Sequence, residues 1–437
     1  MDGSVHRVLD DRGWEEWVAL SSSEFYDDIV ADGRLIGTTV VSVEERTLAH
    51  TRVPLITYPY EWTFSMLRQA AMLQLDLLDD ALQNGLTLKD ATPYNVQFVG
   101  SRPTFIDVGS FERYREGEPW IGYTQFCRQF LYPLLMRAWV GIPFQPWLRG
   151  SIEGPSAADM ARMLPARRKV QPAGLLHVMM QARAEKQFSG EKMRDSLRES
   201  GFNAEMIRNN VAKLRTLIEG LEAGSESAGW VTYEGCDHVG RDRGAKTEFL
   251  RKALAEQGED LDTAVDFGAN DGHFSLVAAE YANSVVAVDG DEPVLDSLWQ
   301  RLRMQGDETI NVVLSDLTDP SPSRGWADAE RASLIGRLDV DLVIAYGVIH
   351  HLIYTASVPP VKVLDWLASF QCAVVVEYVA PEDPMVIQLT ANKEENELHV
   401  DRDRTGFQSR VEERFSIDRK TELEGGTRIL YQLSPLP

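Results

Sequence analysis

Five apolar segments in the second half of the chain end in residues that are suited to holding a ligand. They are Thr263–Phe267 followed by Gly268–Gly272, Ser284–Val288 by Asp289, Ile310–Leu314 by Asp316, Val340–Ala345 by Tyr346–His351, and Ala373–Glu377, which ends in an acid. Parallel strands bring their carboxyl ends to one edge of an open α/β sheet, and ligands bind outside that edge. We therefore expect these residues to form one site.

The segment AVDFGANDG, residues 264–272, is typical of a strand that enters a tight turn before a helix. Glycine permits the backbone angles of such a turn and a close approach to a ligand. Asp289 follows about 20 residues later, where a carboxylate can accept both hydroxyls of a ribose. One alternative is an ordinary strand-to-helix turn. Another is a nicotinamide-dinucleotide domain, which normally has GxGxxG where this chain has GxNxG.

His350 and His351 follow the fourth apolar segment and are candidates for a general base. Histidine titrates near neutral pH, so one of them could remove a proton from an alcohol or an amine. Only one of two consecutive residues is expected to face a pocket, and the other could be a packing residue. Glu377 is expected to orient that histidine or a substrate amine, or alternatively to cap a loop.

A second set of polar residues lies in LKDATPYNVQFVGSRPTFIDVGSFE, residues 88–112. Asp90 precedes Asn95 by five residues, and Asp107 follows in a short apolar segment. Carboxylate and amide oxygens at these positions could hold Mg²⁺ and a nucleotide. The structural alternative is that Asp90 and Asn95 brace the loop and Asp107 caps it.

Alternation of strands and helices after residue 246 predicts a doubly wound, mostly parallel sheet. The last two strands, Phe415–Arg419 and Arg428–Leu433, form a hairpin, so one of them should run antiparallel. Upstream, helical spacing predicts a helix over residues 62–83, then two short strands, then a mostly helical region over 120–220. Residues 1–60 are expected to form an arm or small sheet. Tyr233 and Lys246 belong to a segment expected to cover the ligand.

The connection at residues 318–334 is long for a strand-to-strand loop and carries Trp326. Long loops over strand ends are often lids. The alternative is a surface excursion whose tryptophan packs locally.

The formal net charge of −23 and the pI of about 4.8 argue against nucleic acid and anionic membranes as partners. The cysteines, Cys127, Cys236 and Cys372, have no zinc-ligand spacing, so no metal site is expected, and they fit a reducing cytoplasm. No apolar run approaches the ~18 residues of a membrane span. We expect a cytoplasmic protein.

The residues from about 230 to 437 resemble a class I S-adenosylmethionine-dependent methyltransferase, with a Rossmann-like seven-stranded sheet. VDFGANDG, VVAVDGD, VLSDLTDP, DLVIAYGVIHHL and VVVEYVAPEDP carry the resemblance. It implies S-adenosylmethionine as cofactor. Asp266 and Gly268 would lie beside its amino-acid part, with Asn270 and Gly272 completing the turn; Asp289 would bind the ribose, Asp316 would face the adenine amine and Leu317 would pack near the ring. Asn270 replaces a frequent glycine, but asparagine tolerates the unusual backbone angles.

Nearly the whole chain resembles the bacterial NoeA-like group of nodulation proteins, through YPYEWTFSML, LTLKDATPYNVQF, PTFIDVGSFE, QFCRQFLYPLL, SPSRGW, GVIHHL and EYVAPEDPMV. Residues of about 60–220 resemble the C-terminal lobe of kinases and aminoglycoside phosphotransferases. There Asp90 would accept a proton, and Asn95 and Asp107 would hold Mg²⁺. Lys89 replaces the usual histidine or glycine, and no lysine precedes it, which favours a degenerate scaffold.

These features predict four segments: an arm or small sheet at 1–60, a mainly helical kinase-lobe-like α+β domain at 61–222, a linker and covering segment at 223–245, and a methyltransferase domain at 246–437. The expected reaction is methyl transfer to an oxygen or nitrogen of a small or carrier-bound metabolite. A bifunctional kinase–methyltransferase and a non-catalytic cofactor sensor are the alternatives.

Overall fold

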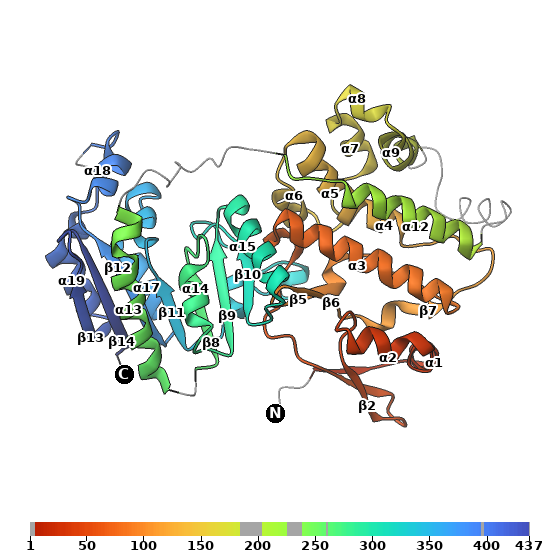
Figure 1. The fold of residues 1–437 in the computed structure, drawn as a ribbon, viewed down its shortest axis with the longest axis horizontal. Helices are drawn as coiled ribbons and strands as arrows, with labels where there is room; N and C mark the ends of the chain where they lie inside the picture. Colours follow the sequence, from red (N-terminus) through yellow and green to blue (C-terminus); the bar gives the residue numbers. More distant parts are fainter. Residues whose placement is uncertain (1–4, 184–202, 225–237, 259–260, 395–396, 437) are drawn as a thin grey trace. The chain divides into compact units, whose positions relative to one another are not determined.

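The computed structural model describes residues 5–183, 203–224, 238–258, 261–394 and 397–436 (Figure 1). The chain divides into two compact units, Met1–Ser227 and Ala228–Pro437. Most of the predicted linker, with Tyr233 and Cys236, lies outside the described residues. The segment boundaries drawn from the sequence stay predictions.

The described part of the second unit is built on a seven-stranded sheet in the order β10-β9-β8-β11-β12-β14-β13. The strands are β8 (Thr263–Phe267), β9 (Ser284–Asp289), β10 (Ile310–Leu314), β11 (Leu342–Ala345), β12 (Ala373–Val379), β13 (Phe415–Glu422) and β14 (Arg428–Pro435). β10, β9, β8, β11 and β12 pair in parallel, while β14 pairs antiparallel with both β12 and β13. This is the predicted Rossmann-like sheet with one antiparallel strand.

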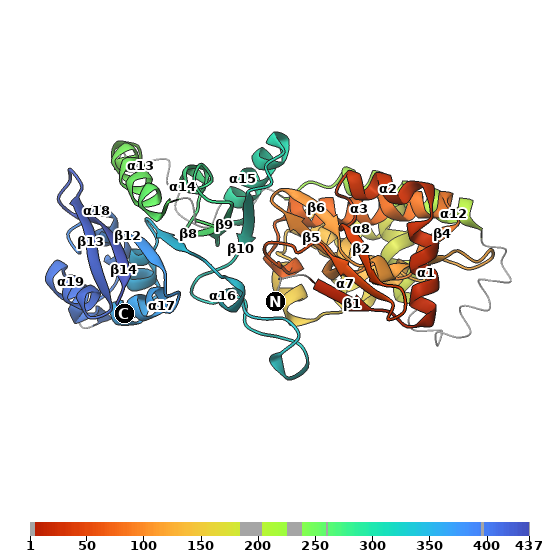
Figure 2. The ribbon, with the colours of Figure 1, turned by 90° about the horizontal axis from the view of Figure 1, so that it is seen from below.

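Helices cover both faces of this sheet (Figure 2). One face carries α13 (His238–Gln257), α14 (His273–Ala278) and α15 (Glu292–Gln305), and the other carries α17 (Pro360–Ala368) and α19 (Arg404–Glu412). The central strands are buried on both sides, which explains their continuous apolar sequences. α16 (Leu334–Arg337) and α18 (Pro384–Thr390) lie in the connections after β10 and β12.

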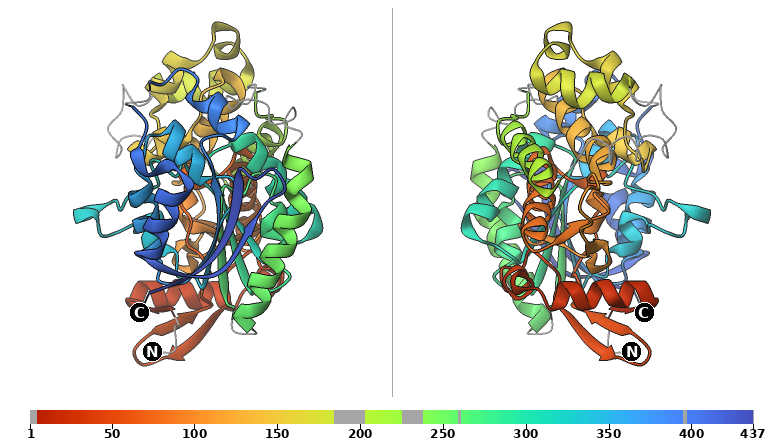
Figure 3. Two further views of the ribbon diagram at one scale, coloured as in Figure 1. Left: turned by 90° about the vertical axis from the view of Figure 1, so that its left-hand side faces the viewer. Right: turned by 90° about the vertical axis from the view of Figure 1, so that its right-hand side faces the viewer.

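The long connection after β10 forms a narrow arm, drawn in cyan (Figures 2 and 3). Arg324 and Arg331 exchange two backbone hydrogen bonds of 2.8 and 3.0 Å at its base. The short helix η9 (Trp326–Asp328) forms its tip, and Trp326 is 84% exposed. In this conformation the tryptophan does not pack locally, contrary to the second of the two interpretations of this loop.

The first unit begins with a three-stranded antiparallel sheet in the order β1-β3-β2. Its strands are β1 (Val5–Val8), β2 (Thr38–Ser42) and β3 (Thr47–His50). Two helices that the sequence did not indicate precede β2, namely α1 (Asp11–Ser21) and α2 (Glu24–Ala31). Asp10 caps α1 by accepting the Gly13 N–H at 2.6 Å, and the helix buries Trp17 and Leu20.

The predicted helix over 62–83 is α3 (Phe64–Gln83), capped by Thr63 and followed by Gly85 in the left-handed conformation. Two antiparallel pairs of short strands follow. β4 (Leu86–Leu88) pairs antiparallel with β7 (Phe111–Arg113), and β5 (Val96–Val99) pairs antiparallel with β6 (Arg102–Phe105). The second of the two predicted short strands ends at Phe105, because Asp107 caps the short helix η3 (Val108–Ser110) that follows.

The remainder of the described first unit is helical, as predicted. Its α-helices are α4 (Tyr123–Phe126), α5 (Tyr132–Leu135), α6 (Gln145–Gly150), α7 (Ala157–Met163), α8 (Ala166–Lys169), α9 (Pro172–Gly174) and α12 (Ala204–Glu219). Three π-helical segments interrupt them, at Cys127–Leu131, Met136–Val140 and Leu175–Met180. α12 packs along α3 (Figures 1 and 3).

Candidate functional site

The turn between β8 and α14 has the backbone that its glycines predict. Gly268 and Gly272 have φ values of +77° and +76°, and Asn270 has +47°. A Cβ on Gly268 would lie 2.9 Å from Val348 Cβ, and one on Gly272 would lie 2.5 Å from Leu298 Cδ1. Both positions therefore require glycine for conformation and for space. Asn270 adopts the unusual angle expected of it.

Asp289 lies at the end of β9 and faces this turn. Its Oδ2 accepts the backbone N–H of Asn270 at 2.9 Å, and its Oδ1 accepts that of Asp291 at 2.9 Å. Burial raises the pKa of this carboxyl, while the backbone hydrogen bonds oppose the increase. The structure thus joins the predicted ribose acid to the predicted glycine turn.

Asp266, near the end of β8, is 1% exposed. Its Oδ2 accepts a hydrogen bond of 2.7 Å from Ser275 Oγ on α14. Burial, reinforced by the negative charge of Asp289, raises the pKa of Asp266 to about 7 in spite of the Ser275 hydrogen bond. Asp266 therefore exchanges its proton close to neutral pH, and a nearby cation would favour its ionised form.

Asp316 and Leu317 follow β10 at the outer part of the same edge. Asp316 is exposed, and its Oδ1 accepts the Thr318 N–H at 2.8 Å and the Thr318 hydroxyl at 2.7 Å. The Ser315 N–H donates to the Asp289 carbonyl at 2.8 Å, which fixes this loop beside the end of β9. Thr318, a residue that the sequence did not single out, orients the Asp316 carboxylate.

His350 and His351 lie after β11, at the start of the π-helical segment η10 (His351–Thr355). π-helical turns occur frequently at functional sites. His350 is 3% exposed, and within the described chain its Nδ1 has no hydrogen-bond partner. The two rings lie 4.3 Å apart. Burial lowers the pKa of both imidazoles, most strongly that of His350, so the neutral, proton-accepting form is favoured.

Glu377 is fully buried on β12 and is surrounded by donors. Its Oε2 accepts from Lys246 Nζ and from the Gly347 N–H, both at 2.8 Å, and its Oε1 accepts from Arg428 at 3.2 Å. Glu377 thus contacts the turn after β11, to which Gly347 belongs, and makes none of these hydrogen bonds with a histidine directly. Arg428 was not singled out in the sequence, since no local pattern marks it.

Lys246 belongs to α13, which the sequence placed over the ligand site. Arg243 of the same helix donates to both carboxylate oxygens of Asp271 in the glycine turn, at 3.0 and 2.8 Å. Thr247 contacts His273 Nε2 at 2.9 Å. The helix therefore touches both the turn and the end of β12.

In the first unit, Asn95 and Asp107 come together, as the second set of polar residues predicts. Asp107 Oδ2 accepts from Ser110 Oγ at 2.7 Å and from Asn95 Nδ2 at 3.5 Å, and Arg7 of β1 forms an ion pair with Oδ1. Although burial raises the pKa of Asp107, the Arg7 and Ser110 hydrogen bonds outweigh it and lower the pKa. Asp90 is placed on the loop by a hydrogen bond of 3.2 Å from Gln74 Nε2 to its carbonyl.

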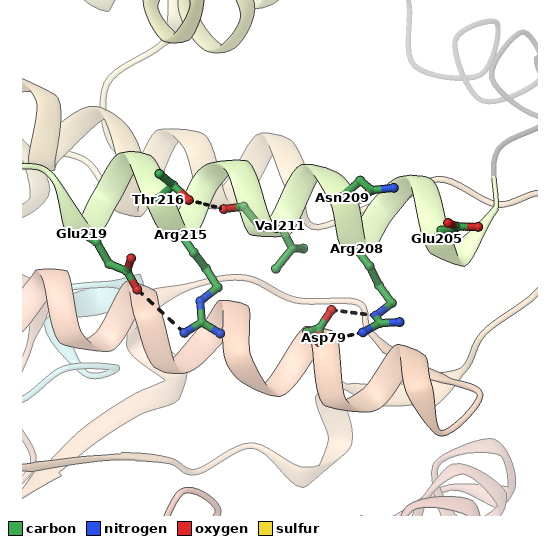
Figure 4. Close-up of a pocket in the computed structure, with 9 residues that line it drawn as sticks. Asp79, Glu205, Arg208, Asn209, Val211, Arg215, Thr216 and Glu219 are labelled. Atoms are coloured by element: carbon green, nitrogen blue, oxygen red, sulfur yellow. Dashed lines mark hydrogen bonds and ion pairs between the residues drawn. The ribbon is translucent and has the colours of Figure 1, made fainter.

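A groove of about 500 Å³ lies between α3 and α12 (Figure 4). Arg208 pairs with Asp79 across it at 2.8 Å, and Arg215, which also lines it, pairs at 2.5 Å with Asp76, which does not. The other lining residues are Glu205, Asn209, Val211, Ala212, Thr216 and Glu219. None of the predicted site residues lines this groove, whose charges serve the packing of the two helices.

No group of three or more histidine, cysteine or acidic side chains is arranged to hold a metal ion in the part of the chain that the structure describes. None of the helices described there is long and apolar enough to cross a membrane.

The chain matches no family model. It is 33% identical over 392 residues to the nodulation protein NoeA of Rhizobium meliloti (strain 1021), covering 88% of this chain and 81% of that protein. The chain belongs to the NoeA family. This confirms the narrower of the resemblances found in the sequence.

Solved methyltransferase structures are similar to part of the chain, with low sequence identity and low TM-scores. The N-methyltransferase NodS of Bradyrhizobium japonicum WM9 is 12% identical, with a TM-score of 0.33, over 46% of this chain and 100% of that one. Magnesium protoporphyrin IX methyltransferase of Synechocystis PCC 6803, with bound SAH, is 14% identical with a TM-score of 0.33, over 48% and 90%.

Proposed function

We propose that this member of the NoeA family is an S-adenosylmethionine-dependent methyltransferase whose cofactor binds at the carboxyl edge of the second-unit sheet. The observation that carries the proposal is the hydrogen bond between Asp289 and the Asn270 N–H. It couples an acid at the end of β9 to a turn in which two glycines leave space that a Cβ would fill. Three carboxylates, Asp266, Asp289 and Asp316, follow neighbouring strands and suit a ligand with an ammonium group, a ribose and an adenine amine.

Each strand-end residue has a role in this proposal. Asp266 and Gly268 lie beside the amino-acid part of the cofactor, and Asn270 and Gly272 complete the turn around it. Asp289 accepts the ribose hydroxyls; for the adenine, the roles assigned from the resemblance go to Asp316 and Leu317. Bound S-adenosylmethionine supplies a methyl group that its sulfonium already activates, so the chain needs chiefly to orient the acceptor and remove a proton.

Proton removal falls to the two consecutive histidines, with His350 the better supported. Its burial keeps the imidazole neutral, and its Nδ1 has no partner among the described residues, so that nitrogen can accept a proton. The acceptor in the proposal is an oxygen or nitrogen of a small or carrier-bound metabolite. Glu377, already bonded to two cations and a backbone N–H, supports this site without taking the proton.

For the first unit we propose a degenerate phosphotransferase-like scaffold. Its support is the order α3, β4, the Asp90–Asn95 loop, β5, β6, Asp107 and β7, together with the pairings of β4 with β7 and β5 with β6. Arg7 forms an ion pair with Asp107, whose carboxylate would hold Mg²⁺ in an active phosphotransferase. Calorimetric titration with Mg-ATP, using Asp107→Ala as control, tests this. We expect no heat of binding; binding that Asp107→Ala abolishes would establish the bifunctional alternative.

Label transfer from tritiated S-adenosylmethionine tests the methyltransferase proposal itself. Acceptors are sought in a small-molecule fraction and a protein-bound fraction of a bacterial extract, with Asp289→Ala and His350→Gln as comparison variants. The proposal predicts label in one fraction, abolished by Asp289→Ala and strongly reduced by His350→Gln. Tight binding of the cofactor without any label transfer would instead support a cofactor-sensing protein.

A further inference from the structure

One face of α13 contacts three separate segments at the carboxyl edge of the sheet. Arg243, Lys246 and Thr247 are three and four residues apart, so they share a face of the helix. Arg243 holds Asp271 in the glycine turn, and Thr247 contacts His273 at the start of α14. Lys246 reaches Glu377 at the end of β12. A single rigid helix therefore touches both the turn that cradles the cofactor in our proposal and the region of the histidines.

Through Lys246, this face of α13 contacts Glu377, which in turn contacts the turn that precedes the two histidines. A fully buried carboxylate is costly unless it is paired and hydrogen-bonded. Here Lys246 and Arg428 supply two cations, and their side chains are themselves only 13% and 15% exposed. Arg428 is held in turn by Asp383, which accepts from its Nε at 2.9 Å and from its Nη2 at 3.0 Å. Arg428 is thus fixed by a second acid, while Lys246 is carried by the long helix α13.

The remaining partner of Glu377 is the backbone of the turn that leads to His350. Gly347 has a φ of +63° and donates its N–H to Glu377 Oε2 at 2.8 Å. Three residues later the chain reaches His350, whose ring is buried. The hydrogen bond fixes where the turn begins, and so the direction in which the chain enters the π-helical segment after it.

We infer that Glu377, held by Lys246 and Arg428, is a positioning residue that sets the turn at residues 346–350 and thereby the orientation of the His350 imidazole. The inference rests on the proposed function for its catalytic meaning and extends it. Through Lys246 the position of this turn is linked to α13, and through Arg243 to the glycine turn. The ion pair between Lys246 and Glu377 therefore holds the turn at residues 346–350 against the same helix that contacts the glycine turn.

Nuclear magnetic resonance of the ligand-free full chain tests the positioning role without an acceptor. The probes are the Gly347 amide and the His350 ring, which can be assigned among the eight histidines by a His350→Gln variant. Glu377→Gln keeps the volume but removes the charge, so we expect the Gly347 amide proton to move upfield and the His350 ring signal to shift. Glu280→Gln, which removes an exposed ion pair with Arg251 in the same unit, is the matched control and should move neither signal.

A second pair of variants keeps the inference testable if the buried change prevents folding. Lys246→Met combined with Glu377→Gln leaves no unpaired charge at either position, and it should fold and show the same two shifts. Unchanged Gly347 and His350 signals in a folded Glu377 variant would overturn the inference.

Calorimetry with S-adenosylhomocysteine separates this inference from the proposed function. Glu377→Gln should retain the wild-type affinity within about twofold, as expected of sites that do not share a partner. Failure of the wild-type protein to bind would contradict the proposed function, whereas the resonance shifts would still report on the positioning of the turn. A much larger loss of affinity in Glu377→Gln would place Glu377 in the cofactor site and contradict a positioning role.

Discussion

The carboxylate of Asp289 accepts the backbone N–H of Asn270 at 2.9 Å, 19 residues earlier in the chain. The donor is the backbone N–H of Asn270 and not its side chain. Residue 270 has a φ of +47°, in the left-handed region. The turn therefore presents its N–H to the acid that we assign to the ribose, and that acid is held in place before any ligand arrives.

The backbone character of this contact predicts the effect of changes at residue 270. Asn270→Gly should preserve the hydrogen bond, because glycine adopts a positive φ without steric cost. The affinity for S-adenosylhomocysteine should be unchanged and the free energy of unfolding equal or higher. Asn270→Val should lower the free energy of unfolding by about 1–2 kcal/mol, because a branched residue tolerates this conformation poorly. Urea unfolding and calorimetry of the two variants check this. A loss of affinity in Asn270→Gly would show that the side chain matters.

Gly272 should be more sensitive to substitution than a glycine with the same backbone angle and free space. Gly272→Ala combines a φ of +76° with contact to the buried Leu298, so it should cost about 2–4 kcal/mol of unfolding free energy. Gly306→Ala has a φ of +67° and no atom within 4 Å of the new Cβ, so it measures the backbone term alone, about 1–2 kcal/mol. Equal losses in the two variants would contradict the close packing of the turn.

Asp266 should make the stability of the second unit depend on pH. Its pKa of about 7 lies above the unfolded value, so its contribution is fully present at low pH and is lost as the pH rises from about 4 to 7. The loss would be at most about 4 kcal/mol. Asp266→Asn should flatten the free energy of unfolding over this range, whereas Asp262→Asn, at the other end of β8, serves as the control. An unchanged pH profile in Asp266→Asn would argue against a buried, proton-holding carboxyl.

His350 should change the free energy of unfolding with pH in the opposite direction to Asp266. Because burial lowers its pKa, the folded state stays neutral while the unfolded chain takes up a proton below about pH 6.5. The protein should therefore lose stability as the pH falls from 7 to 5, and His350→Gln should reduce that loss. Thermal unfolding across this range measures it, with His399→Gln as the matched variant. Identical slopes in wild-type and His350→Gln proteins would contradict a buried neutral imidazole.

The sheet was predictable because its strands are long apolar segments whose ends carry polar residues. All seven predicted strands are present, and the chief differences are at their ends. β12 continues to Val379 because Tyr378 and Val379 pair with Ile429 and Arg428 of β14, which lie 51 and 49 residues later in the sequence. α1 was missed because it is short and its apolar residues are interleaved with charged ones, although Asp10 caps it and Trp17 and Leu20 are buried.

The candidate site was predictable only where it follows strand order. The acids and the glycine turn are local to strand ends, so their types and positions could be read from the sequence. The partners of Glu377 could not, since Lys246 lies 131 residues before it and Arg428 lies 51 residues after it. The contact between Arg7 and Asp107 spans 100 residues and was likewise invisible. Such contacts depend on the packing of elements, which no local pattern encodes.

The most direct test of the account is a calorimetric titration of S-adenosylhomocysteine into the wild-type protein and Asp289→Ala. Asp296→Ala, which removes an equal charge from a half-buried position on α15, is the control. We predict that the wild-type and control proteins bind alike and that Asp289→Ala loses about 1.5 kcal/mol or more, because charge-assisted hydrogen bonds to the ribose disappear. Equal affinity in the Asp289→Ala protein, or no binding to the wild-type protein, would contradict the assignment of the site.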